Sequence, residues 1–564
     1  MAFQLPIYYN GKKREISEDI HNNLELTETI DPSQQPIYKY LFSPKTELGV
    51  TCLERWKKYY TTDIKFLKDT QKLVKSLKKN EVDKKVIETA WDDWDKIKNE
   101  DNFLEKYQYI EWERIGWLNN SSTFLTVISY YNLTSPVVNL ILPILMLFVP
   151  FFFLKMMKIP VTFKTYKRLL FSQLKNHIIG RLFTEFNNVK LSQKIYMLFS
   201  FGMYIFNFYQ NIVSCYKFYK NLHCVNEIFL NMNTYVKYTL GQFDLVMRKI
   251  KKLKTYSIFK QKMHMHTLYL QKFYANIKVI SSTPISILKI SQLGYMMKYY
   301  YALYADKKLS ESLLFSFNFN GYLDTIEGLN KNISEGYVNK TKYIKEGFNM
   351  MENMYHPSLM YKKPVKNNLR LNKNKIITGP NAAGKTTLIK SSLLNILSSQ
   401  QIGFGYYSKA EICPFDNFHC YLNIPDTSGR DSLFQAEAKR CKKILDNIEK
   451  NPKESHFCIF DELFSGTNPY EAIGSAFSYL DYISKNRNVK FMLTTHYIKL
   501  CKICKKNKEI QNYNMETFLQ KDYQKYTYKL ISGISTIKGG ICVLRDLKFP
   551  SVILKLTQKT IKKL

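Results

Sequence analysis

The sequence predicts an α/β domain at the C-terminal end of a chain whose remainder is mostly helical. The β-branched pair Ile376-Ile377 runs into a glycine-rich loop, and residues 388–397 after the loop have helical character. Two further apolar stretches, 456–461 and 490–495, have the length of buried strands. Residues 217–350 contain few helix breakers and repeat apolar side chains at three- and four-residue spacing, which predicts long helices.

The glycine-rich loop is the most informative stretch. Residues 378–387 read Thr-Gly-Pro-Asn-Ala-Ala-Gly-Lys-Thr-Thr, which contains the complete G-x-x-x-x-G-K-[ST] pattern of a P-loop. Backbone N–H groups and the helix N-terminus after such a loop face phosphate oxygens. Lys385 adds a positive charge there, and the Thr386 hydroxyl is placed to hold Mg²⁺. The residues expected to bind ATP here are Gly379, Pro380, Asn381, Gly384, Lys385, Thr386 and Thr387.

Two downstream strands end in residues that complete such a site. The stretch His456-Phe-Cys-Ile-Phe-Asp461-Glu462 ends in two carboxylates, which is a Walker B pattern. We expect Asp461 to hold Mg²⁺ through water and Glu462 to polarise the attacking water. The stretch 490–496 ends in His496, which is placed to sense the γ-phosphate. With Lys385, these residues predict an ATP hydrolase.

These motifs together resemble one family, the MutS-like proteins. The resemblance rests on Asn381 within the loop, on Asp461-Glu-Leu-Phe-Ser-Gly466-Thr-Asn468, and on Thr-Thr-His-Tyr at 494–497. His356-Pro357 before the loop also matches. Ser428-Gly-Arg-Asp-Ser-Leu-Phe-Gln-Ala-Glu437 resembles the signature loop, whose serine reaches the partner subunit's nucleotide in this family. The resemblance implies that role for Ser432.

The resemblance extends toward the N-terminus. Residues 40–56 are similar to the start of the MutS core, in which a Thr-x-x-Gly turn opens a helix that ends in Leu-x-x-Trp, and Gln71 and Val74 follow. It implies an ABC-type MutS ATPase domain C-terminal to an all-α core and lever region. The expected parts are an N-terminal segment (1–39), the first part of the core (40–134), a hydrophobic hairpin (135–216), lever helices (217–350), the ATPase domain (351–545) and a C-terminal dimerisation segment (546–564).

The charge of the chain favours an anionic partner. Lys and Arg number 83 against 47 Asp and Glu, which gives a formal net charge of +36 among 564 residues. An AT-rich coding sequence, which favours Lys and Asn, explains the same excess. The densest basic cluster lies in residues 248–262 and either grips DNA phosphates or is a solvated helix face. Cys501-Lys-Ile-Cys504 has no second pair that would complete a zinc site.

Two uncharged apolar runs interrupt the helical region. Residues 137–154 and 195–213 each approach the roughly 20 residues that cross a bilayer. Pro143 and Pro150 would break a soluble helix but are tolerated in membranes. Residues 155–194 between the runs hold one acid, Glu185, among many Lys and Arg. Two membrane spans, a re-entrant loop and a buried soluble helix pair all fit this pattern.

The mismatch-reading members of the family carry an N-terminal domain whose Phe-x-Glu wedge stacks on a mispaired base. About 40 residues precede the core here, so we expect no such domain. Phe183-Thr-Glu185 matches the three letters within the basic loop, and we interpret it as chance. The chain is therefore most similar to the branch of the family that lacks this domain and carries a hydrophobic hairpin. The stacking aromatic of the family's adenine pocket aligns near Val365, which is not aromatic.

Two functions follow as expectations. The first is an intracellular, dimeric MutS-like ATPase that clamps mispaired or branched DNA in mismatch repair or recombination, its partner being an identical or a second MutS-like chain. The second is a membrane-tethered ATPase that acts on a protein or membrane partner. The charge and the two-part resemblance favour the first, and the apolar runs and the missing wedge favour the second.

Overall fold

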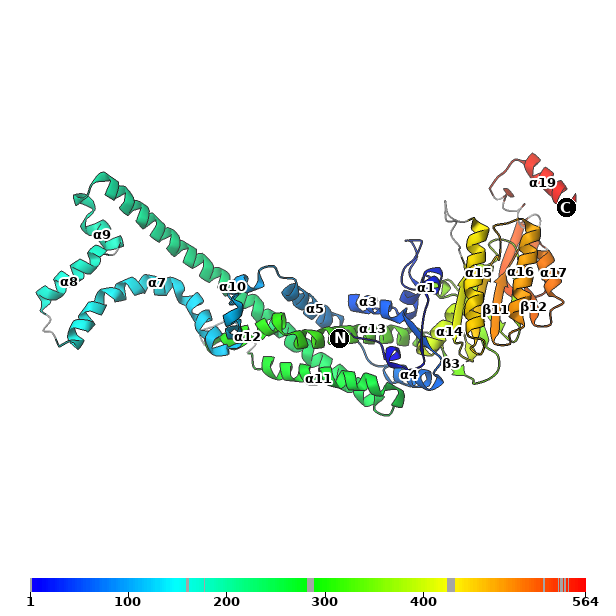
Figure 1. The fold of residues 1–564 in the computed structure, drawn as a ribbon, viewed down its shortest axis with the longest axis horizontal. Helices are drawn as coiled ribbons and strands as arrows, with labels where there is room; N and C mark the ends of the chain where they lie inside the picture. The colour runs from blue at the N-terminus through cyan, green and yellow to red at the C-terminus, as the bar shows by residue number, and fades with distance from the viewer. Residues whose placement is uncertain are drawn as a thin grey trace. The chain divides into compact units, whose positions relative to one another are not determined.

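The computed structural model describes residues 3–158, 162–176, 178–280, 289–422, 432–520, 523–535, 537, 541, 544–545 and 547–563. The chain forms two compact units (Figure 1). The first comprises Met1–Lys84, Phe243–Met265 and Phe315–Leu564, and the second comprises Lys85–Gln242 and His266–Leu314.

The larger sheet of the first unit has the strand order β13-β12-β6-β11-β10-β9. The strands from β12 to β9 run parallel, and β13 pairs antiparallel to β12 at one edge. Strands β6, β10 and β11 are almost entirely buried, which explains their continuous apolar sequences. The strands are β6 (Asn374–Thr378), β9 (Asn417–Tyr421), β10 (His456–Asp461), β11 (Val489–Thr494), β12 (Ile510–Gln520) and β13 (Tyr523–Ser532).

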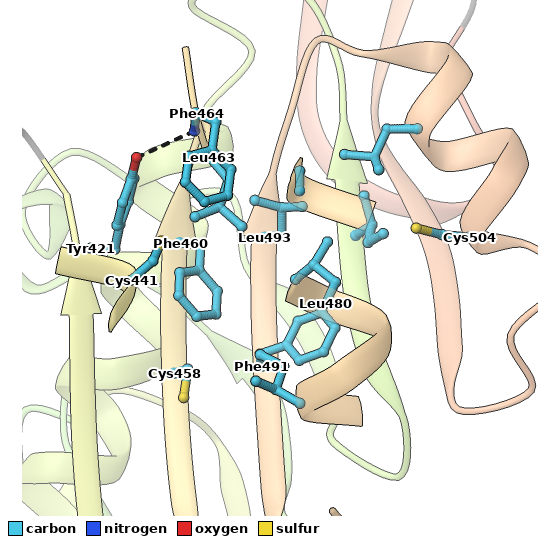
Figure 2. Close-up of a cluster of buried hydrophobic side chains, with 14 of the residues drawn as sticks. Tyr421, Cys441, Cys458, Phe460, Leu463, Phe464, Leu480, Phe491, Leu493 and Cys504 are labelled. Carbon is cyan, nitrogen blue, oxygen red and sulfur yellow. Dashed lines mark hydrogen bonds between the residues drawn. The ribbon is translucent and has the colours of Figure 1, made fainter. Parts of the chain in front are cut away.

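One face of this sheet is closed by a single apolar cluster. Figure 2 shows Phe460 of β10 and Phe491 of β11 beside Leu480, with Cys504 at the edge. The Tyr421 hydroxyl accepts a hydrogen bond of 3.3 Å from the backbone N–H of Phe464, so the cluster also holds the turn after β10. Cys501 and Cys504 lie in this core as buried thiols. The helices in the cluster are α15 (Leu433–Lys450), α16 (Pro469–Ser484) and α17 (Ile498–Cys504).

Helix α14 (Lys385–Ile402) lies between the larger sheet and a second one of order β5-β4-β8-β3-β7. Almost every residue of α14 is buried, including several polar ones. Asn395 shows how these are satisfied: its amide accepts from Tyr406 N at 2.6 Å and donates to Tyr355 O at 3.2 Å. The strands of the second sheet are β3 (Asn339–Tyr343), β4 (Met350–Met354), β5 (Asn367–Arg370), β7 (Phe404–Gly405) and β8 (Lys409–Ile412).

The N-terminal helices of the first unit pack against α14 and its surroundings. The predicted Thr-x-x-Gly turn is confirmed as a helix start, because the Thr46 hydroxyl accepts from Gly49 N at 2.9 Å and caps α3. Gln71 donates to Thr341 O and Gly403 O at 2.9 and 2.6 Å. The elements are η1 (Pro6–Tyr9), β1 (Lys13–Glu15), α1 (Glu18–Asn23), α2 (Ile37–Phe42), α3 (Glu47–Trp56), β2 (Tyr59–Thr61), α4 (Ile64–Ser76) and η4 (Lys254–Tyr256).

In the described part of the second unit, the regular elements are helices. Helix α12 packs on α7, where Gly294 lies against Ser122 and Thr126 so closely that a Cβ would collide with their backbone. The helices of this part of the chain, some of which continue into the first unit, are α5 (Lys84–Lys98), α6 (Phe103–Lys106), η2 (Glu113–Asn120), α7 (Ser122–Met156), α8 (Phe163–Asn176), α9 (Ile178–Thr184), η3 (Phe186–Asn188), α10 (Leu191–Ile250), α11 (Ser257–Ile277), α12 (Ile290–Ala305) and α13 (Lys307–Ser334). The last helix of the predicted lever region thus ends at Ser334, before β3 begins.

The two apolar runs lie on α7 and α10, which α8 and α9 connect (Figure 1). Helix α7 is continuous through Pro136, Pro143 and Pro150. Among the described residues, one stretch, Ser122–Leu142, is long and apolar enough to cross a membrane by length and composition, and little of it is buried. Large apolar side chains beyond it are also exposed, such as Phe152 at 65% and Phe199 at 68%.

Candidate functional site

The glycine-rich loop connects the C-terminal end of β6 to the N-terminus of α14. Gly384 caps the helix at φ 88°, a left-handed conformation that glycine adopts without strain. Ala382 takes φ 62° in the same loop, a conformation that a residue with a Cβ adopts at a cost. The loop is therefore held in a strained shape in front of a helix N-terminus, where the helix dipole attracts anions.

Lys385 is the first residue of α14, and its side chain turns back under the loop. Its ammonium donates to Gly379 O at 3.0 Å and to Pro380 O at 3.1 Å. Burial lowers the pKa of Lys385, and the nearby carboxylates of Glu462 and Asp461 oppose that effect. The ammonium is thus partly desolvated, which strengthens its attraction for phosphate oxygens.

Asp461 lies at the end of β10, directly across from Thr494 at the end of β11. Its Oδ2 accepts from the Thr386 hydroxyl at 2.9 Å, and its Oδ1 accepts from the Thr494 hydroxyl. The structure therefore brings together Thr386 and Asp461, the two predicted Mg²⁺ residues. A hydroxyl and a carboxylate are hard oxygen donors, and Mg²⁺ prefers such a partial ligand set completed by phosphates and water. The donors present fit this ion.

Glu462 and His496 form a pair beside Lys385. Glu462 Oε1 lies 2.9 Å from His496 Nε2, and the same Nε2 lies 3.2 Å from Lys385 Nζ. The hydrogen bond from His496 lowers the pKa of Glu462, against the effect of burial, so this carboxyl is held ionised. One ring nitrogen cannot donate to Glu462 and accept from Lys385 at once, so the proton on Nε2 decides which partner it binds.

The turn after β10 is braced by α15. The Glu437 carboxylate is buried and accepts from Ser465 N at 3.1 Å, from its hydroxyl at 2.9 Å and from Gly466 N at 3.1 Å. Gly466 lies against Leu433 so closely that a Cβ would collide with it. Asn468 caps α16 by accepting from the backbone N–H groups of its first turn. The Gly-Thr-Asn motif therefore fixes the direction of the chain after the two carboxylates.

Ser432 lies at the start of α15, the helix that braces this turn. It caps α15 through a reciprocal pair with Gln435, in which the Ser432 hydroxyl accepts from Gln435 N at 3.3 Å and Gln435 Oε1 accepts from Ser432 N at 3.0 Å. The preceding part of the predicted signature loop, 428–431, lies outside the described residues.

A cavity of about 810 Å³ opens along the loop. Its size suits a nucleotide. Asn381, Lys385, Thr386, Thr387 and Glu462 line one part of it. Residues 354–367 line another part and include Val365, the position where the resemblance expects an aromatic ring. His356 also lines the cavity, and burial beside Lys390 lowers its pKa to about 4, so it is neutral.

Three contributors to the cavity were missed by sequence reasoning. Met515 of β12 and Tyr528 of β13 lie against the loop, and a Cβ on Gly384 would meet the Tyr528 ring at 3.2 Å. The N-terminal stretch from Leu24 to Ile37 supplies a further wall. No motif marks these residues, because they reach the loop through the pairing of β12 with β6 and through the packing of α2 on residues 357–359. Tyr528 is one of several tyrosines in the β12–β13 hairpin, so its residue type does not single it out in the sequence.

Comparison with known proteins identifies the C-terminal part of the chain. The sequence profile of MutS domain V matches residues 375–564. Proteins named DNA mismatch repair protein MutS are similar over part of their length. The one from Persephonella marina is 28% identical over 233 residues, 40% of this chain and 26% of the relative. The one from Parabacteroides distasonis is 31% identical over 192 residues, 34% of this chain and 22% of the relative.

A third relative, from Clostridium perfringens, is 28% identical over 253 residues, 43% of this chain and 27% of the relative. The match therefore spans about a quarter of the length of these relatives. The matched profile includes the glycine-rich loop, both carboxylates and His496. Residues 375–564 of this chain, which include strands β9 to β13 of the larger sheet, are therefore similar to domain V of the MutS family.

Proposed function

We propose that this chain is a MutS-like ATPase whose P-loop domain binds ATP with Mg²⁺ and hydrolyses it. One observation carries the proposal: Lys385, Thr386, Asp461, Glu462 and His496 meet at the C-terminal ends of three adjacent parallel strands and one helix N-terminus. Ligands of parallel α/β sheets bind at this edge. The match of residues 375–564 to MutS domain V, the ATPase domain of that family, supports the same activity.

The proposed chemistry uses the contacts already in place. The Lys385 ammonium would exchange the loop carbonyls for oxygens of the β- and γ-phosphates. Glu462 would orient a water molecule toward the γ-phosphorus and draw its proton as the bond to ADP breaks. With a proton on Nε2, His496 would hold the Glu462 carboxylate in place. The contact of Nε2 with Lys385 is the alternative state, and a bound γ-phosphate would favour one of the two. Bound Mg²⁺ would neutralise phosphate charge as it builds up.

We propose, further, that the ATPase acts as part of a dimeric clamp on mispaired or branched DNA, in mismatch repair or recombination. The names of the relatives and the charge of +36 support a DNA partner. Arg248, Lys249, Lys251, Lys252 and Lys254 are exposed where α10 gives way to η4, a position open to phosphates. In the dimer, Ser432 would lie near the partner's nucleotide, and α19 (Ser551–Lys563) would form a contact between the two chains. The domains would be those expected from the sequence.

The test is ATP hydrolysis and DNA binding by the purified chain. The turnover rate is measured for the wild-type and Lys385→Ala proteins. Binding to matched, single-mismatch and four-way-junction DNA is then measured at one physiological salt concentration, with and without ATP. Turnover that depends on Lys385, together with a structure preference that ATP changes, supports the proposal. Turnover without a preference for any of the three DNA structures would support the proposed ATPase activity and exclude the proposed DNA clamp.

A second function has its own observation. Helices α7 and α10 expose large apolar side chains along both predicted runs, and lipid would cover such a surface without cost. A membrane-associated ATPase with a hydrophobic hairpin would explain this exposure. Flotation of the purified chain with lipid vesicles tests the membrane contact, because a chain without one stays at the bottom of the gradient, while the DNA-binding measurement above tests the clamp.

A further inference from the structure

The N-terminal stretch lies against the proposed nucleotide site although it is more than 300 residues away in sequence. Leu24, Glu25, Gln34, Gln35 and Ile37 line the same cavity as the glycine-rich loop. The triphosphate would lie along the loop and Lys385, so the base and ribose must reach the other walls. Those walls come from residues 354–367 and from this N-terminal stretch.

The stretch is fixed in position by its own hydrogen bonds. Ile37 N donates to Glu25 O and Tyr38 N donates to Leu26 O, both at 3.0 Å, which closes residues 27–36 into a loop. Leu24, Leu26 and Ile37 are buried beneath it. The buried Tyr38 hydroxyl donates to Gln401 at 2.7 Å, near the end of α14. The loop is thus anchored to the helix that follows the glycine-rich loop.

Two further contacts tie the stretch to the ATPase fold. Asp19 of α1 pairs with Arg440 of α15, whose guanidinium also donates to Cys420 O at 2.8 Å. Glu25 lies 4.0 Å from Lys390 of α14, and both of these side chains line the cavity. Glu25 holds φ 54°, a strained conformation that the surrounding contacts maintain.

Gln34 and Gln35 are exposed amides at this wall. Gln34 Nε2 donates to Asp31 at 3.2 Å, and Gln34 N donates to Asp31 O at 3.0 Å. This arrangement orients the Gln34 amide and leaves its oxygen as an acceptor toward a ligand. An acceptor matches the exocyclic amino group of adenine, whereas guanine presents a carbonyl oxygen at the same position.

We propose that residues 24–37 form the base-side wall of the nucleotide site and that Gln34 and Gln35 are specificity-determining residues that favour ATP over GTP. This inference rests on the proposed nucleotide site. It gives the chain a source of base selectivity that does not need an aromatic residue at Val365. It also makes the N-terminal segment part of the ATPase site.

The test measures the Kd of fluorescent ATP and GTP analogues for the full chain in the presence of Mg²⁺. In the Gln34→Ala/Gln35→Ala variant, we expect the Kd for ATP to rise roughly 5- to 20-fold, as the loss of one or two hydrogen bonds predicts, and the Kd for GTP to change less than about 2-fold. Asn22→Ala/Glu28→Ala is the matched control, because Asn22 lies just before residues 24–37, Glu28 lies within them, and neither lines the cavity. Its Kd values should equal those of the wild type.

A second variant tests the orientation of the Gln34 amide separately from its presence. Asp31→Ala keeps both glutamines but releases the Gln34 amide, so the preference for ATP over GTP should fall while total binding is retained. Thermal unfolding of each variant confirms that the fold is intact. If the wild type binds ATP and the double glutamine variant binds both nucleotides with wild-type Kd values, the inference is wrong and the proposed function stands. If the wild type binds neither nucleotide, the proposed function itself fails.

Discussion

Helix α14 and helix α7 invert the usual relation between polarity and burial. Helix α14 buries Ser391, Asn395 and Gln400, whereas α7 exposes residues such as Leu145 and Phe152. In α14 each buried amide has backbone partners, so desolvation is compensated by hydrogen bonds. Among the described residues of α7, large apolar side chains such as Leu145 and Phe152 stay exposed to solvent. The polar groups of α14 are therefore satisfied within the chain, whereas the exposed apolar surface of α7 is suited to contact with lipid or another chain.

The largest expected effect is at the site that α14 begins. Glu462→Gln keeps the size of the side chain but removes the charge that, in the proposed function, polarises water, so kcat for ATP should fall about 10²- to 10⁴-fold. Steady-state phosphate release measures this, and nucleotide Kd should change little. Glu449→Gln, an exposed glutamate on α15, is the matched control and should keep full turnover. Unchanged turnover in Glu462→Gln would assign the water-orienting role elsewhere.

The exposed surface of α7 gives the next largest effect. Replacing Leu145, Phe152 and Phe153 with serine removes three large apolar side chains, each worth roughly 1.5–3 kcal/mol when transferred out of water. If lipid covers α7, vesicle partitioning should fall at least roughly 100-fold by flotation. Equal partitioning of wild type and variant would remove the membrane role from this helix. The thermal stability of the first unit should not change in either case.

The buried face of α14 gives a smaller, structural effect. Asn395→Ala leaves Tyr406 N and Tyr355 O without their buried partner, and the free energy of unfolding should fall by about 2–4 kcal/mol. Chemical denaturation measures this change. Asn22→Ala, at an exposed position on α1, should cost less than about 0.5 kcal/mol. Equal destabilisation of the two variants would mean that α14 is not the buried centre of this unit.

The smallest effect concerns the contact of the N-terminal segment with α15. Burial acts to raise the pKa of Asp19, but hydrogen bonds and charge from Arg440 and Lys443 lower it below the ordinary 3.8. Its stabilising contribution is therefore complete above about pH 4 and is lost as the pH falls through the lowered pKa. Asp19→Asn should reduce the melting temperature slightly at pH 7, and this reduction should shrink steadily as the pH falls below the ordinary value of 3.8. A difference that stays the same size as the pH falls would contradict an ionic origin.

The contiguous parts of the site could be predicted because their chemistry is local. Gly384 and Lys385 are neighbours whose roles follow from one turn of backbone, and Asp461 with Glu462 needs only a strand end. Thr494 could not be recognised as a partner of Asp461, since that contact depends on which strand lies beside β10. Tyr528 and Met515 were missed for the same reason: strand order brings them to the loop.

The sequence by itself determined the local elements: the glycine-rich loop, the acidic strand end, the Thr46-capped helix and the two apolar runs. Each depends on residues a few positions apart, where backbone geometry follows from residue type. Only the tertiary structure decided which distant segments share a surface. It placed Gln34 and Gln35 at the cavity and Glu437 under the turn at Gly466. Such contacts come from long-range packing, which no spacing along the chain encodes.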